Sequence, residues 1–181
     1  MDVRHIPEQP KRRDVAEVVF LKDDGTYPNN DRLPVLVYAR GLNLPPFDAS
    51  LAVAALFNQH RWSGCWVSGV YAYPHYHSTA HEALGVVSGE ARLRLGGDND
   101  LRIGVRPGDL LILPAGVVHE SLSASGDFAV VGAYPTGQRP DLCTGEAGER
   151  PGVDRNIARV PLPTHDPLLG EAGVLHRHWK G

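Results

Sequence analysis

The chain of 181 residues has few cysteines, no long apolar run and little excess charge of either sign. Its two cysteines, Cys65 and Cys143, are too few for a disulfide framework, and their spacing fits neither a zinc knuckle nor a redox pair. We therefore expect two free thiols in a reducing cytoplasm. No stretch approaches the ~18 apolar residues of a membrane span, and the N-terminus lacks the apolar core of a signal peptide.

Charge also argues against some partners. The sequence has 18 basic and 21 acidic residues, for a formal net charge of -3. The longest basic block is Lys11-Arg12-Arg13, close to the N-terminus. A nucleic-acid-binding domain needs a larger basic surface than this. We therefore expect a cytoplasmic protein with neither a nucleic acid nor a membrane as partner.

Turn-forming residues are plentiful, with 20 glycines and 15 prolines, which favours short strands over long helices. β-branched and apolar segments separated by turn clusters predict strands at 15–22, 35–38, 67–77, 82–87, 91–95, 101–105, 110–113, 117–122 and 128–134. One Ala/Leu-rich segment, 49–58, predicts a helix with Asp48 as its N-cap. Strands at this spacing indicate an all-β antiparallel sandwich or barrel.

The ends of the chain differ from its middle. Residues 1–14 are polar, and we expect little order there. No internal repeat is present, so we expect a single domain over 1–181 with its barrel core at about 62–135. Residues 136–181 are rich in proline and glycine but keep apolar anchors. They predict an arm that wraps the barrel or a neighbouring subunit, with free disorder as the alternative for the last ten residues.

Four residues in the middle of the chain could bind one metal ion. Residues two apart on a strand share a face, so His75 and His77 project together. A hairpin through 78–80 would bring Glu82 onto the neighbouring strand, and His119 would come from another adjacent strand. Three imidazoles and one carboxylate suit a divalent Fe, Mn, Ni, Co or Zn ion and leave about two coordination positions open.

Several residues near the predicted ligands have more than one expected role. Tyr71 and Tyr73 share the expected strand face with the histidines, so they are candidate catalytic residues, although packing inside the barrel explains them equally well. His81 should face away from Glu82, at the surface or in contact with the ligands. Trp66, just before this segment, is expected in the core or in an interface.

Two segments resemble the motifs of the cupin superfamily. The first motif, G-x5-H-x-H-x4-E-x6-G, is matched at Gly69, His75, His77, Glu82 and Gly89. The second, G-x5-P-x-G-x2-H, is matched at Gly108, Pro114, Gly116 and His119. The family's second motif usually ends in asparagine four residues later, where this chain has Ser123. That asparagine is not a ligand, so the difference leaves the metal site intact.

The resemblance implies a double-stranded β-helix, the RmlC-like jelly roll of cupins, with short helices and a metal ion in the barrel mouth. It also implies a homodimer. The expected function is that of a metal-dependent enzyme of dioxygenase, decarboxylase or isomerase type, with oxidoreductase chemistry among these alternatives. Its small-molecule substrate would be an organic acid, a sugar or an enol. The alternative is a non-catalytic cupin that binds a metal or metabolite as a sensor or store.

Overall fold

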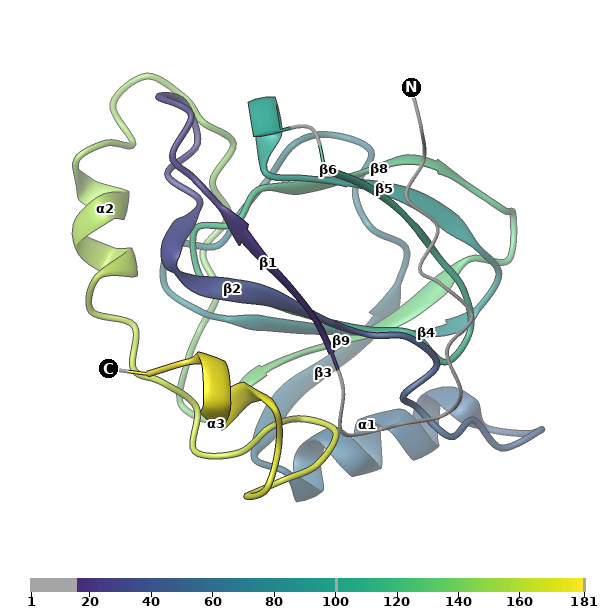
Figure 1. Cartoon of the computed structure of the whole chain (residues 1–181). Coiled ribbons are helices and arrows are strands. Elements are labelled where there is room, and N and C mark those ends of the chain that lie inside the picture. The colour runs from purple at the N-terminus through teal and green to yellow at the C-terminus, as the bar shows by residue number, and fades with distance from the viewer. Residues whose placement is uncertain (1–15, 100, 181) are drawn as a thin grey trace.

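A computed structural model describes residues 16–99 and 101–180, so the expectation for residues 1–14 lies outside the described chain. Within this part, two antiparallel β-sheets face each other (Figure 1). The elements in chain order are β1 Glu17–Leu21, β2 Asn30–Tyr38, α1 Ala49–Gln59, β3 Trp62–Ser68, β4 Glu82–Ser88, β5 Ala91–Leu95, a single 3-10 turn Gly97–Asn99, β6 Leu101–Val105, β7 Leu110–Leu113, β8 His119–Ala124, β9 Ala129–Pro135, α2 Gly152–Ile157 and α3 Leu175–His178.

The strand order is that of a jelly roll. The larger sheet has the order β1-β2-β7-β4-β9-β3, and the smaller sheet has the order β6-β5-β8. Most neighbours are distant along the chain, as for β4, which pairs with β7 on one side and β9 on the other. This topology confirms the predicted all-β double-stranded β-helix with short helices. The larger sheet also includes β1 and β2, which precede the expected barrel core.

The two sheets differ in how they are covered. The central strands of the larger sheet are buried on both faces, so β7 is an unbroken apolar strand. Its Leu111 and Leu113 pack between the sheets, whereas Leu110 and Ile112 pack on the side that carries α1 and α3 (Figure 1). The smaller sheet has one exposed face, and the residues of β5 accordingly alternate between buried and accessible positions.

Helix α1 lies where the sequence predicts it, but it begins differently. Asp48 occupies the N-cap position in a left-handed conformation with a φ of 56°, and its side chain makes no capping hydrogen bond. The helix is held instead by packing of Val53 and Phe57 on β4. A Cβ at Gly85 would lie 2.9–3.1 Å from Leu42, Phe57 and Val53, so a glycine is needed there for this close approach. No helix in the described ranges is long and apolar enough to span a bilayer.

The C-terminal arm packs on the chain's own barrel. The Trp179 indole is 3% exposed and donates to the carbonyl of Pro34 on β2 at 2.8 Å. The Trp62 indole on β3 donates to the carbonyl of His165 in the arm at 2.8 Å. The arm therefore extends the core beyond the two sheets, and residues 172–180 form part of this packing rather than a free tail.

Candidate metal centre

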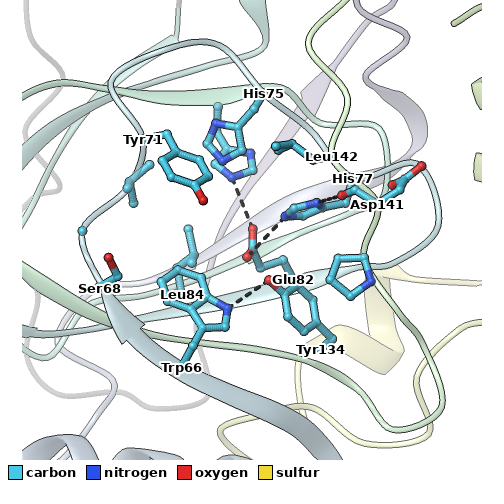
Figure 2. Close-up of a pocket in the computed structure, with 14 residues that line it drawn as sticks. Trp66, Ser68, Tyr71, His75, His77, Glu82, Leu84, Tyr134, Asp141 and Leu142 are labelled. Carbon is cyan, nitrogen blue, oxygen red and sulfur yellow. Dashed lines mark hydrogen bonds and ion pairs between the residues drawn. The ribbon is translucent and has the colours of Figure 1, made fainter.

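A pocket of about 340 Å³ opens between the two sheets and holds the predicted ligands (Figure 2). Its walls come from β3, β4, β8 and β9, from the segment before Ser78, and from the start of the arm. The lining residues are Trp66, Ser68, Gly69, Val70, Tyr71, His75, His77, Glu82, Leu84, His119, Tyr134, Pro140, Asp141 and Leu142.

His75 and His77 reach this pocket by a backbone path that differs from the one predicted from the sequence. The expected continuous strand 67–77 is wrong, because β3 ends at Ser68 and residues 69–74 are irregular. Gly69 and Pro74 both weaken a regular strand, proline because it lacks a backbone N–H. The chain leaves the larger sheet and His75 pairs with His119 in β8, through backbone hydrogen bonds of 3.1 and 2.9 Å. The expectation that His119 lies on an adjacent strand is thus confirmed.

Glu82 lies across the pocket from these histidines. A hairpin through 78–80 is also wrong, because Glu82 opens β4 in the larger sheet, and β4 pairs only with β7 and β9. The segment 78–81 is a crossover between the sheets. It places the Glu82 carboxylate 3.5 Å from His77 Nε2 and 3.2 Å from His119 Nε2. The predicted ligands therefore converge from both sheets rather than from one hairpin.

All three imidazoles are oriented in the same way by the backbone. The Nδ1 atom of His75 lies 3.1 Å from the Tyr73 carbonyl, and that of His119 lies 3.1 Å from the Val117 carbonyl. His77 Nδ1 contacts the carbonyl of Asp141. When Nδ1–H donates to a carbonyl, the lone pair of a neutral imidazole is on Nε2. This is the arrangement that orients histidine ligands in metal sites.

The donor set fits a divalent cation. Ligand atoms of His77, Glu82 and His119 lie within 4.8 Å of one another. Glu82 is 3% exposed, and its Oε2 has no hydrogen-bond donor. Neutral Nε2 lone pairs directed at a carboxylate repel it unless a proton or a metal ion lies between them. A metal ion held here would satisfy these atoms.

The pKa shifts of Glu82 and His75 favour the forms that bind a metal ion, whereas that of His77 favours the protonated form. Burial would raise the pKa of Glu82, but His119 and His77 hold it below its usual value, so the group is a carboxylate. Burial and the neighbouring His119 lower the pKa of His75 to about 4, which leaves a neutral imidazole, the form that binds metals. Burial alone would lower the pKa of His77, but Glu82 and Asp141 raise it overall. His75 is adjacent to the group formed by His77, Glu82 and His119, because its ring centroid lies 4.1 Å from that of His119.

Asp141, in the C-terminal arm, was not predicted from the sequence. Its carboxylate accepts hydrogen bonds from the backbone of Ser78 at 2.6 Å and of Thr79 at 3.2 Å, and from the Ser78 hydroxyl. Its carbonyl orients His77. Asp141 thereby attaches the arm both to the crossover 78–81 and to His77, which immediately precedes it. Some sixty residues separate these partners, and no sequence motif links them.

Two aromatic residues form the opposite wall (Figure 2). Trp66 on β3 donates from Nε1 to the Tyr134 hydroxyl on β9 at 2.9 Å. The indole lies over Gly132, where a Cβ would come within 2.1 Å of it. Burial and the nearby Glu82 raise the pKa of Tyr134, so its phenol stays protonated. Trp66 thus lines the pocket and is only partly buried in the core, and Tyr134 joins the candidate site.

The two predicted tyrosines lie at the mouth of the pocket. Tyr71 lines it, and Tyr73 stacks on Tyr71 with centroids 4.9 Å apart and planes at 15°. Their exposures are 54% and 42%. Figure 2 shows the Tyr71 hydroxyl directed toward the space above Glu82. Tyr71 is therefore placed to touch a bound molecule, and Tyr73 supports its ring.

His81 turns away from Glu82 as expected but is not at the surface. It is 1% exposed, its Nδ1 accepts the Ala115 N–H at 2.9 Å, and its ring packs on Trp179 at 4.7 Å between centroids. Burial lowers its pKa to about 3, so the ring is neutral. Ser123, the departure from the second motif, is exposed on β8 and does not line the pocket.

Comparison with known proteins gives the family. Residues 66–131 match the family model of the cupin domain. The uncharacterized protein YjlB of Bacillus subtilis (strain 168) is 38% identical over 164 residues, which cover 91% of this chain and 96% of YjlB.

Among solved structures the similarity is weaker. One is an acireductone dioxygenase from Bacillus anthracis with a cadmium ion in its active centre. It has a TM-score of 0.43 and 18% identity over 59% of this chain and 82% of that one. Another is a protein with a double-stranded β-helix domain from Klebsiella pneumoniae. It has a TM-score of 0.36 and 17% identity over 78% of this chain and 84% of that one. The cupin-domain match and the near full-length similarity to YjlB show that this chain belongs to the cupin superfamily, with the character of a small bacterial cupin.

Proposed function

We propose that the protein is a metal-dependent enzyme that holds one divalent Fe, Mn, Ni, Co or Zn ion through His75, His77, Glu82 and His119. The observation that carries the proposal is the common orientation of the three imidazoles toward one buried carboxylate at the base of an open pocket. A closed structural site would have no such access. The proposed reaction is of dioxygenase, decarboxylase or isomerase type on a small organic acid, sugar or enol.

The protein's own residues would bind the substrate and hold the protons that it exchanges. A divalent ion at this position supplies a Lewis acid that polarises a substrate oxygen. Trp66 donates its N–H to Tyr134, so the Tyr134 hydroxyl keeps its own proton for donation toward Glu82 or a substrate oxygen. The Tyr71 hydroxyl is placed for the same purpose at the mouth. The apolar side chains Leu84 and Leu142 would exclude water from the bound molecule.

The alternative is a cupin that binds a metal or metabolite without turnover. One observation favours it. Among the described residues that line the pocket, the carboxylate of Asp141 is engaged by Ser78 and Thr79. Apart from the proposed ligands, only the hydroxyls of Ser68, Tyr71 and Tyr134 then remain among these lining side chains as groups that could exchange a proton. A sensor or storage protein requires no more than this.

Metal analysis of purified variants tests the site. His77→Ala should lower the bound metal from about one ion per chain to a small fraction without unfolding the barrel. His178→Ala, at an exposed histidine of α3, is the matched control and should keep its metal. Unchanged stoichiometry in His77→Ala would contradict the ligand assignment.

Turnover separates the enzyme from the binding protein. Each metal-loaded form would be assayed with β-diketones, oxalate and sugar acids, following O2 consumption and product masses. Product formation that is lost in His77→Ala supports the enzyme. Tight metabolite binding with every metal-loaded form inert would favour the non-catalytic alternative.

We also propose a cytoplasmic homodimer that acts on small molecules, with neither nucleic acid nor membrane as partner. Cys65 and Cys143 are both free thiols, which supports a reducing compartment. Sedimentation equilibrium at micromolar concentration would give twice the chain mass of 19.6 kDa for a dimer. A mass equal to one chain would contradict it.

A further inference from the structure

We infer that the pocket selects a flat, ring-bearing molecule that carries one negative charge, rather than a polyanion or a sugar. The inference rests on the proposed function and narrows its substrate class. Three properties of the pocket carry it: its aromatic walls, its lack of basic side chains and its shortage of polar partners.

The walls suit the faces of a ring. Tyr71 lies edge-on to His75 with centroids 5.0 Å apart, and it is backed by the stacked ring of Tyr73. Trp66 and Tyr134 form the opposite side. Aromatic pairs gain energy beyond area burial in stacked and edge-on arrangements. The volume of about 340 Å³ exceeds the roughly 150 Å³ that accommodates benzene, which leaves space for substituents.

Charge limits the ligand to a single negative group. Among the described lining residues there is no lysine or arginine, and Glu82 and Asp141 carry the formal charges. Arg94 on β5 pairs instead with Glu120, outside the pocket. A divalent ion with three neutral imidazoles and the Glu82 carboxylate as ligands carries one net positive charge, and the Asp141 carboxylate, which is bonded to the backbone of Ser78 and Thr79, opposes any further negative charge nearby. A monoanion neutralises it, whereas phosphate or a dicarboxylate would bring a further charge without a partner.

Polar partners are too few for a sugar. Each hydroxyl of a bound sugar that loses water must find a hydrogen-bond partner, or binding is penalised. The side chains that remain are the hydroxyls of Ser68, Tyr71 and Tyr134, while the lining also includes Val70, Leu84, Pro140 and Leu142. The pocket therefore matches a ring with one or two oxygen atoms better than a polyol.

Matched probes on the zinc-loaded protein test this selection by calorimetry, without an activity assay. Benzohydroxamate and acetohydroxamate share one monoanionic chelating group and differ by a phenyl ring. Oxalate chelates as a dianion, and gluconate represents the sugar acids. Relative to their affinities for aqueous zinc, benzohydroxamate should bind about tenfold more tightly than acetohydroxamate, the gain expected for burying a ring between aromatic walls. Oxalate and gluconate should bind more weakly than both.

Two variants locate the selection in the pocket. Tyr71→Ala should remove about threefold to tenfold of the preference for benzohydroxamate and leave acetohydroxamate unchanged. Phe47→Ala, at a ring that is 82% exposed and away from the pocket, should change neither. Leu142→Lys, at a lining position that is 54% exposed, should shift the preference toward oxalate.

The outcomes separate the inference from the proposed function. If the protein retains zinc but binds both hydroxamates equally, or binds oxalate or gluconate most tightly, the inference is wrong and the metal site stands. If wild type and His178→Ala are both folded and wild type retains no zinc, the metal site is wrong and the inference fails with it.

Discussion

At the scale of single residues, the candidate site depends on which nitrogen of each histidine is occupied by a backbone carbonyl. Tyr73, Val117 and Asp141 supply these carbonyls to His75, His119 and His77. A fourth histidine, His81, uses its Nδ1 in the opposite sense, as an acceptor for a backbone N–H. Position in the motif therefore does not determine function, because His81 lies between two of the proposed ligands in sequence and contributes to the packing of the barrel.

Replacement of His81 should affect stability rather than metal binding. His81→Ala leaves the buried Ala115 N–H without an acceptor and removes the ring from Trp179, so we expect a loss of about 2 to 4 kcal/mol in the free energy of unfolding. His81→Asn keeps an acceptor oxygen close to the position of Nδ1 and should lose clearly less. Urea denaturation measures both, and metal analysis should give one ion per chain in each folded variant. Equal losses in the two variants, or loss of metal from the folded His81→Asn protein, would contradict the assignment.

At the scale of elements, the C-terminal arm is held by a buried carboxylate. Asp166 is fully buried and accepts the backbone N–H groups of Leu168, Leu169 and Leu175 at 2.8–3.2 Å, as well as the hydroxyl of Tyr38 on β2. One side chain thus shapes the turn before α3 and attaches it to the larger sheet. Helix α1, in contrast, relies on packing, because its N-cap side chain makes no bond.

Loss of the Asp166 carboxylate should loosen the arm. Asp166→Ala leaves several buried donors without an acceptor, so unfolding should become easier by about 3 kcal/mol or more. Limited proteolysis should then cut the arm after residue 160 in Asp166→Ala and spare it in wild type. Asp31→Ala, at an exposed aspartate of β2, is the control and should change stability by less than about 0.5 kcal/mol. A protease pattern identical to wild type in Asp166→Ala would show that the arm does not depend on this contact.

At the scale of the whole molecule, the candidate site joins the two sheets. Glu82 belongs to the larger sheet, whereas His119 belongs to the smaller one and His75 pairs with it. A bound ion would therefore connect the halves of the barrel at its open end. The arm adds a third connection, since Asp141 holds both His77 and the crossover between the sheets.

Metal should stabilise the whole barrel. At a free zinc concentration of about 100 times Kd, linkage adds about 2.7 kcal/mol to the free energy of unfolding. In a protein of this size that corresponds to a rise of roughly 5 to 10 °C in Tm. Scanning calorimetry should show this rise in wild type and in His178→Ala, its reversal by EDTA, and its absence in His77→Ala. An equal rise in His77→Ala would mean that zinc stabilises the protein from another position.

Most of the secondary-structure elements and the residues with metal-binding chemistry could be predicted from the sequence. Seven of the nine predicted strands and the helix overlap the observed elements closely, because alternation and turn residues are local signals, and an eighth, 35–38, covers only the C-terminal part of β2. The ninth, 67–77, was extended too far, since local alternation does not show where a chain leaves one sheet for another. Motif spacing and the resemblance to the cupin motifs predicted that His75, His77, Glu82 and His119 share one pocket, although the hairpin expected to join them is absent from the described chain.

The surroundings of those residues, in contrast, depend on how the chain folds in three dimensions. The site is lined from distant segments of the chain by Trp66, Tyr134 and Asp141. No local sequence pattern predicts that these residues lie at the site. The burial of His81 likewise depends on Trp179, almost a hundred residues away. The physical reason is the same in each case. Periodicity reports which face of a strand a side chain takes, whereas its neighbours depend on which strands and loops pack against that face.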